Sequence, residues 1–244
     1  MAQSLAKFIR DAPPGETDIL ETRVDHCTRV SLPGSNTEKT VICKFNRLAD
    51  SVFYHNDVIF EYDSRTNSTS ASSSHEAPAA KPLVEELQAT VARYVAQHYP
   101  SDSAFGVFAQ QSADEVAVVL VDNKFSPNNY WNGRWLGQYV VNTASKTVSG
   151  RVALDIHYYE DGNVRLKTHK DVSESLSDTS ASGIAQKLAS IEEQYQTQVN
   201  KTFVNLNEGP FKSLRRQLPV TRSKMDWYQP LALNPMHGNN NNEN

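Results

Sequence analysis

A cluster of basic side chains near the end of the chain is the part of the sequence best suited to binding chemistry. Within residues 211–227, Asp226 is the single acidic residue, although the whole chain has a formal net charge of −4. The basic residues are Lys212, Arg215, Arg216, Arg222 and Lys224, and Trp227 closes the segment. Guanidinium and ammonium groups form charge-assisted hydrogen bonds with carboxylates and phosphates. The segment therefore predicts a site for an anionic partner, and the alternative is a solvated basic face without a ligand.

Catalytic and metal-binding patterns are weak in this sequence. The ten glycines are scattered and form no phosphate-binding loop. The seven histidines stand singly, and His157 and His169 are expected on neighbouring strands, where cross-strand polar contacts are favoured over a zinc site. Glu192 and Glu193 fit a solvated helix face better than an acid–base pair. We therefore expect no enzymatic activity, no metal and no cofactor.

Cysteine content and hydropathy indicate a protein of a reducing compartment. Cys27 and Cys43 are the only cysteines. They could pair, but without a secretory signal they are better interpreted as free thiols. No stretch approaches the roughly 20 apolar residues of a membrane span, and the N-terminus lacks the apolar core of a signal peptide. The expected location is intracellular, and 244 residues suffice for one large domain or two small ones.

The elements that must position a binding segment are clearest after Pro82. A helix is predicted first, because apolar residues recur at helical spacing at Leu83, Leu87, Val91, Tyr94 and Val95. Five strand-like runs follow, over residues 104–110, 115–122, 134–142, 147–160 and 163–171. The short connections, including the turn sequence Asp161-Gly162-Asn163, favour an antiparallel meander. The predicted fold class is α+β, with about five antiparallel strands.

A second, longer helix is predicted over residues 182–206. Its apolar stripe consists of Ile184, Leu188, Ile191, Tyr195, Val199, Phe203 and Leu206. At ~1.5 Å per residue the helix is about 36 Å long, whereas five strands at ~4.8 Å each span about 20 Å. The helix should therefore cross the sheet and extend past it, which predicts a further surface that covers the extension.

The first 82 residues give weaker signals. A short helix is predicted over residues 3–10, and strands over residues 40–45 and 57–63. Residues 64–82 are rich in serine and are predicted to be a linker or loop without secondary structure. The predicted organisation is a reduced N-terminal region (1–63), this linker (64–82), a helix–sheet–helix region (83–210) and a basic segment with a tail (211–244).

Several motifs resemble the α subunit of the heterodimeric F-actin capping protein. They are AKFIRDAPPGE (6–16), YWNGRW (130–135), HYYEDGNVRL (157–166), HKDV (169–172), EQYQT (193–197) and FKSLRRQLPVTRSKMDW (211–227). The resemblance is firm from about residue 83 to 227 and weak between 17 and 82. The chain departs from the family in two ways. Most helices that follow the APPGE motif are missing, and Pro230 and Pro235 oppose the family's C-terminal amphipathic helix.

The resemblance implies a role that needs no covalent chemistry. In the family, basic residues of the last motif bind acidic grooves at the barbed end of an actin filament, which implies this role for Lys212, Arg216 and Arg222. Arg215, Lys224 and Trp227 belong to the same expected actin-binding segment. Because the bound protein occupies the surface that the next actin monomer would use, subunit addition and loss are blocked sterically. The implied location is the cytoplasm, at the cortical actin cytoskeleton.

The resemblance also implies a partner subunit. The family pairs this subunit with a β subunit and merges their strands into one sheet that both long helices cross. The residues then expected at the dimer interface are Ile184, Leu188, Ile191, Tyr195, Val199 and Phe203; the alternative for each is a purely internal core position.

Other partner classes compete for the basic segment. Acidic phospholipids carry suitable charge, and binding them would make the chain a membrane-surface, phosphoinositide-binding cytoskeletal adaptor without capping activity. Nucleic acid is not expected, because the net charge is negative, the basic segment is short and no recognition motif surrounds it.

Overall fold

The computed structural model describes residues 19–35, 37–72, 82–99, 102–159 and 164–208. Three of the sequence-based predictions lie outside these residues: the helix over residues 3–10, the turn at Asp161-Gly162-Asn163 and the basic segment 211–227. Contacts between Cα atoms divide the chain into two compact units, Met1–Thr197 and Gln198–Asn244. The domain boundaries proposed from the sequence remain predictions.

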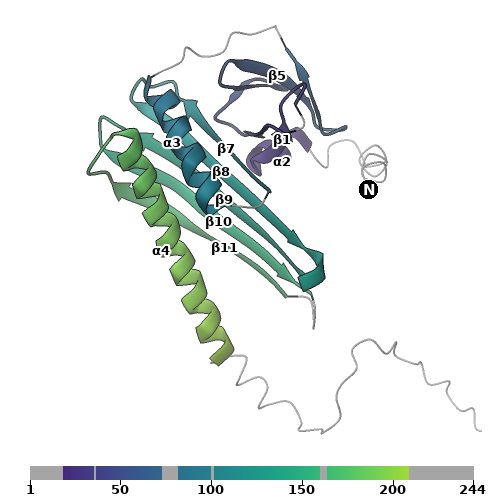
Figure 1. Ribbon diagram of the computed structural model, residues 1–244, viewed down its shortest axis with the longest axis vertical. Coiled ribbons are helices and arrows are strands. Elements are labelled where there is room, and N and C mark those ends of the chain that lie inside the picture. The colour runs from purple at the N-terminus through teal and green to yellow at the C-terminus, as the bar shows by residue number, and fades with distance from the viewer. Residues whose placement is uncertain (1–18, 36, 73–81, 100–101, 160–163, 209–244) are drawn as a thin grey trace, which may run out of the picture. The chain divides into compact units, whose positions relative to one another are not determined.

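The centre of the first unit is a five-stranded antiparallel sheet (Figure 1). Its strands are β7 (Asp102–Ala109), β8 (Glu115–Ser126), β9 (Trp131–Asn142), β10 (Thr147–Tyr158) and β11 (Val164–Ser175). A short 3-10 helix, η1 (Pro127–Asn129), connects β8 to β9. Each strand pairs with its neighbour in sequence, so the order is β11-β10-β9-β8-β7. The predicted meander and the α+β fold class are confirmed.

Two helices lie against one face of this sheet (Figure 1). They are α3 (Pro82–His98) and α4 (Ala181–Glu208). The predicted stripe of α3 buries Leu87, Val91 and Val95, as its spacing requires. Helix α4 begins after Ser180, whose Oγ accepts a hydrogen bond from the Gly183 amide at 3.1 Å, which is the geometry of an N-cap.

The N-terminal elements form two smaller sheets. After α2 (Ile19–Asp25), a two-stranded sheet contains β1 (Thr28–Ser31) and β2 (Lys39–Ile42). A four-stranded sheet contains β3 (Arg47–Ala49), β4 (Val52–His55), β5 (Val58–Asp63) and β6 (Ser68–Ala71). The strands predicted over residues 40–45 and 57–63 correspond to β2 and β5. The other four strands were not predicted.

Strand β6 corrects the prediction that residues 64–82 have no secondary structure. Ser68–Ala71 pairs antiparallel with β5, and Phe60 lies opposite Ala71 in the register. Most side chains of β6 are exposed, so the strand is held by backbone hydrogen bonds and carries no apolar alternation. Tyr62 Oη also donates a 2.9 Å hydrogen bond to Asn67 Oδ1 in the preceding turn. A composition rich in serine therefore did not exclude an edge strand.

The N-terminal elements contact the sheet face opposite the helices. One core cluster there contains Cys27, Val41, Cys43, Tyr54, Ala104, Phe108, Ala117, Val119 and Val121. The Tyr54 hydroxyl donates to the Ala109 carbonyl at 3.3 Å, and its ring packs edge-on against Phe108. Burial raises the pKa of Tyr54 to about 12. In the part of the chain that the structure describes, no helix is long and apolar enough to cross a membrane.

A buried histidine predicts that stability depends on pH. His55 is buried at the end of β4, and its Nδ1 lies 2.7 Å from Thr40 Oγ1. Burial lowers the pKa of His55 below its ordinary value. The unfolded chain therefore takes up this proton at a higher pH than the folded chain does. The contribution to stability should be complete above about pH 6.5 and decrease as the pH falls below that value.

Thermal unfolding at about pH 7.5 and about pH 5.5 measures this effect. The wild-type chain should lose more stability between the two values than His55→Gln, because glutamine can still contact Thr40 and does not titrate. An equal loss in both proteins would show that His55 is not responsible.

Candidate functional site

The seam between α4 and the sheet contains a buried acidic residue that the sequence analysis placed in solvent. Glu192 is only 4% exposed, whereas the neighbouring Glu193 is exposed as predicted. Glu192 follows Ile191 directly and lies four residues after Leu188, so it stands at the edge of the apolar stripe and points toward the sheet. The interpretation of Glu192 as a solvated helix residue was wrong.

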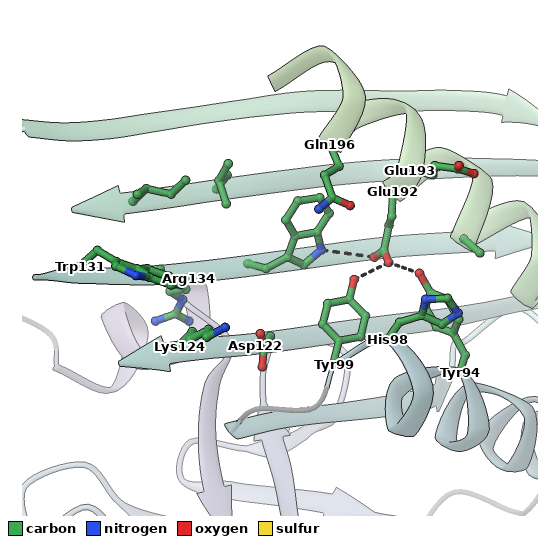
Figure 2. Close-up of a pocket in the computed structure, with 15 residues that line it drawn as sticks. Tyr94, His98, Tyr99, Asp122, Lys124, Trp131, Arg134, Glu192, Glu193 and Gln196 are labelled. Carbon is green, nitrogen blue, oxygen red and sulfur yellow. Dashed lines mark hydrogen bonds between the residues drawn. The ribbon is translucent and has the colours of Figure 1, made fainter. Parts of the chain in front are cut away.

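Four hydrogen-bond donors converge on the Glu192 carboxylate, and Figure 2 shows the Tyr94 and Tyr99 hydroxyls pointing toward it. Oε2 accepts from the Tyr94 hydroxyl at 2.6 Å and from the Tyr99 hydroxyl. Oε1 accepts from the Tyr139 hydroxyl at 2.9 Å and from Trp135 Nε1 at 3.4 Å. Tyr94 belongs to α3, Tyr99 follows it, and Trp135 and Tyr139 belong to β9. One carboxylate thus connects α3, α4 and the sheet.

The electrostatics of this cluster keep the phenols protonated. Burial, followed by the negative charge of Glu192, raises the pKa of Tyr94, Tyr99 and Tyr139. A buried carboxylate is tolerated where hydrogen-bond donors replace its hydration shell. Phenols held in the protonated form are poor bases and nucleophiles, so this arrangement serves to fix the elements in place.

Gly137 on β9 provides the space that the cluster occupies. A Cβ atom at this position would lie 2.8 Å from Tyr139 Cε2 and 3.1 Å from Glu192 Oε1. Both distances are shorter than ordinary carbon contacts. The absent side chain therefore permits the Tyr139 ring to lie along its own strand and reach the carboxylate.

A cavity of about 580 Å³ adjoins the cluster (Figure 2). Its wall combines residues of α3, α4 and strands β8–β10. The apolar part of the wall is formed by Trp131, Trp135, Leu154 and Ile156, all of which are half-buried. Lys124 supplies positive charge, and its ammonium lies 5.2 Å from the centre of the Trp131 ring. The cavity thus presents aromatic and cationic surface on the helix-covered face of the sheet.

The structure places the predicted interface residues in two groups. Ile184, Leu188, Ile191 and Tyr195 are at most 4% exposed and are buried within this chain. Val199 is half-buried, and the side chain of Phe203 lies outside the described residues. The predicted actin-binding residues Lys212, Arg215, Arg216, Arg222, Lys224 and Trp227 also lie outside them.

The sheet register separates the two histidines considered as zinc ligands. His157 lies opposite Arg165, whereas His169 lies opposite Ala153. Among the described residues there is no group of three or more His, Cys, Asp or Glu side chains arranged to hold a metal ion. Cys27 and Cys43 are both free thiols and both buried.

Comparisons with known proteins agree with this fold. The sequence model of a family described as F-actin capping protein alpha subunit matches residues 17–234. An F-actin-capping protein subunit alpha from Gibberella zeae is 38% identical over 252 residues, covering 92% of this chain and 92% of the relative. The corresponding protein of Yarrowia lipolytica is 39% identical over 255 residues, covering 94% and 92%.

A solved structure shares the fold. The homodimeric actin capping protein alpha subunit from Plasmodium berghei aligns with a TM-score of 0.65, covering 91% of this chain and 99% of that one. The sequence identity is 18%, so this likeness concerns the arrangement of helices and strands alone.

Proposed function

Because the chain belongs to the F-actin capping protein alpha subunit family, we propose that it is the α subunit of a heterodimer that binds barbed ends of actin filaments. The observation that carries the proposal is the family match over residues 17–234, which includes the basic segment. Capping is non-enzymatic: the bound heterodimer blocks the surface that the next actin monomer would occupy. The protein then acts in the cytoplasm, at the cortical cytoskeleton.

The charge pattern supports actin as the partner of the basic segment. Lys212, Arg216 and Arg222 are the proposed contacts, with Arg215, Lys224 and Trp227 in the same segment. An arginine guanidinium pairs with a carboxylate through two parallel hydrogen bonds. A basic strip also accelerates the encounter with an acidic filament end and makes that encounter sensitive to salt. Both properties suit a protein that must find rare filament ends.

Two features of the first unit leave room for a partner subunit. Strand β11 is at the edge of the sheet, and among the described strands it pairs with β10 alone. No other described strand lies along the outer side of its 12 residues, and an edge strand of this kind can pair with a strand from another chain. On the helix-covered face, Trp131, Trp135, Leu154 and Ile156 remain half-exposed around the cavity. An edge strand beside apolar surface fits continuation of the sheet by a β subunit.

Co-expression with a capping protein β subunit tests this proposal. We expect a soluble 1:1 heterodimer, and we expect the chain alone to give much less soluble protein because its edge strand and apolar surface are uncovered. Light scattering after size exclusion distinguishes heterodimer, homodimer and monomer. The purified heterodimer should stop elongation of filament seeds at the barbed end.

Two results would contradict the proposal. A stable, monodisperse monomer in equal yield without the β subunit would remove the argument from uncovered surface. A homodimer, as described for the Plasmodium berghei protein, would replace the β subunit by a second copy of this chain.

A further inference from the structure

A second cavity lies on the sheet face opposite α4. It has a volume of about 270 Å³, and strands β9, β10 and β11 form most of its wall. Trp135 donates to Glu192 of α4, so its neighbour Arg134 points to the opposite face, where its guanidinium donates to the His26 carbonyl. The charged and titratable residues of the wall are His26, Arg134, Arg151, Asp155, Lys167 and His169. Basic side chains therefore predominate around this cavity, although the formal net charge of the chain is −4.

The strand register brings these side chains together. Asp155 on β10 lies opposite Arg134 on β9 and opposite Lys167 on β11. Ala153 precedes Asp155 by two residues, so it lies on the same face of the sheet, and it is opposite His169. The side chain of alanine ends at Cβ, which leaves room for the cavity between the longer neighbouring side chains.

The carboxylates on this face do not balance its cations. Asp155 accepts two hydrogen bonds from Arg165, at 2.9 and 2.7 Å, whereas the Lys167 ammonium lies 3.7 Å from the same carboxylate, which is longer than a hydrogen bond. Arg151 pairs with Asp171 at 2.7 Å. On this face, the described residues of β9, β10 and β11 include four arginines and lysines but only two aspartates. The face therefore has a surplus of two positive charges.

Arg134 is held in place at the edge of the cavity. Its hydrogen bond to the His26 carbonyl fixes the guanidinium, but a carbonyl carries no net charge that could balance it. Burial lowers the pKa of Arg134, so an anion in the cavity would offset the cost of burying this cation. A cation that is already positioned also loses less side-chain entropy when a ligand binds.

We propose that this cavity binds a phosphate group carried by a small molecule. Arg134, Arg151 and Lys167 would be its cationic contacts, since guanidinium and ammonium groups form charge-assisted hydrogen bonds with phosphate oxygens. A phosphate monoester carries roughly 1.5–2 negative charges at pH 7, which matches the surplus on this face better than a single carboxylate does. Sites for drug-sized ligands have volumes of about 300–1,000 Å³, so this smaller cavity suits one phosphate group with a small attached body.

Calorimetric titration of the purified heterodimer with inorganic phosphate tests the proposal. Lys167→Ala should weaken phosphate binding about fivefold, because one charge-assisted contact is lost. Lys170→Ala is the matched control: it removes the same charge from the same strand, but Lys170 lies opposite the buried Val152, on the other face of the sheet. Its affinity for phosphate should stay within about twofold of wild type.

A second variant tests the cavity without changing any charge. Ala153→Leu should fill the space between the cations and weaken phosphate binding at least as much as Lys167→Ala, and its melting temperature shows whether the fold persists. The triple alanine variant of Lys212, Arg216 and Arg222 should still bind phosphate at this cavity, because the two sites share no residue.

The source of the phosphate group can be distinguished with soluble inositol trisphosphate as a second probe. Tighter binding of this probe than of inorganic phosphate, again weakened by Lys167→Ala, would identify a phosphoinositide headgroup, whereas similar binding of both would identify a free phosphate. Three results would overturn the proposal: no binding to the wild-type protein at about 10 mM phosphate, equal effects of Lys167→Ala and Lys170→Ala, or unchanged binding in a folded Ala153→Leu variant.

Discussion

Replacing Glu192 with leucine is expected to lower the free energy of unfolding by about 3 kcal/mol. Leucine roughly fills the volume but removes the acceptor of the Tyr94, Tyr99, Tyr139 and Trp135 hydrogen bonds. Each buried donor that loses its partner costs about 1–3 kcal/mol, and release of the buried charge offsets part of the total. For a chain of this size the melting temperature should fall by about 6–12 °C.

Glu193→Leu is the matched control, because Glu193 is the adjacent residue of the same helix and is exposed. Its effect should stay within about 0.5 kcal/mol. Replacing the three tyrosines with phenylalanine in the Glu192→Leu background should recover much of the loss, since both sides of the hydrogen bonds are then removed. Equal effects of Glu192→Leu and Glu193→Leu would show that the cluster contributes nothing particular to stability.

The burial of Glu192 could not be predicted from the spacing of residues along the helix alone. Two consecutive glutamates on an amphipathic helix are usually solvated, and Glu193 is. Glu192 is buried because side chains of α3 and β9 pack around it. These hydrogen-bond partners lie 53–98 residues earlier in the chain, so no local pattern indicates them. The available signal was its place beside Ile191 in the stripe. Only the sheet register, which sets Tyr139 and Trp135 under α4, turns that position into a hydrogen-bonding site.

The long elements of the fold could be predicted from the sequence, whereas most of the short strands could not. Strands β7–β11 and the two long helices have sustained apolar periodicity, so their type and order follow from the sequence. Strands β1, β3, β4 and β6 have only three or four residues each. Four residues define no clear period, and β6 is polar throughout apart from Ala71. Such strands exist because a neighbour supplies backbone partners, as β5 does for β6.

The prediction with the largest functional effect concerns the basic segment. Replacing Lys212, Arg216 and Arg222 with alanine is expected to weaken barbed-end capping by roughly two decades. Each partly exposed charge-assisted contact contributes about 1 kcal/mol to binding, so the loss of three independent contacts costs about 3 kcal/mol. Most of the electrostatic loss should appear in the association rate, and higher salt should reduce the difference from wild type. The measurement is elongation of filament seeds with increasing heterodimer.

A charge-matched control separates a local contact from a general effect of net charge. Lys39, Arg65 and Arg93 are exposed residues of the first unit, and their triple alanine variant loses the same three charges. If capping depends on the segment itself, this control should cap nearly as well as wild type. If both variants weaken capping equally, long-range attraction suffices and no specific contact is needed. A third outcome is that neither variant weakens capping, while the segment variant alone loses binding to phosphoinositide vesicles. The segment would then bind membranes, and the assignment of these residues to actin would be wrong.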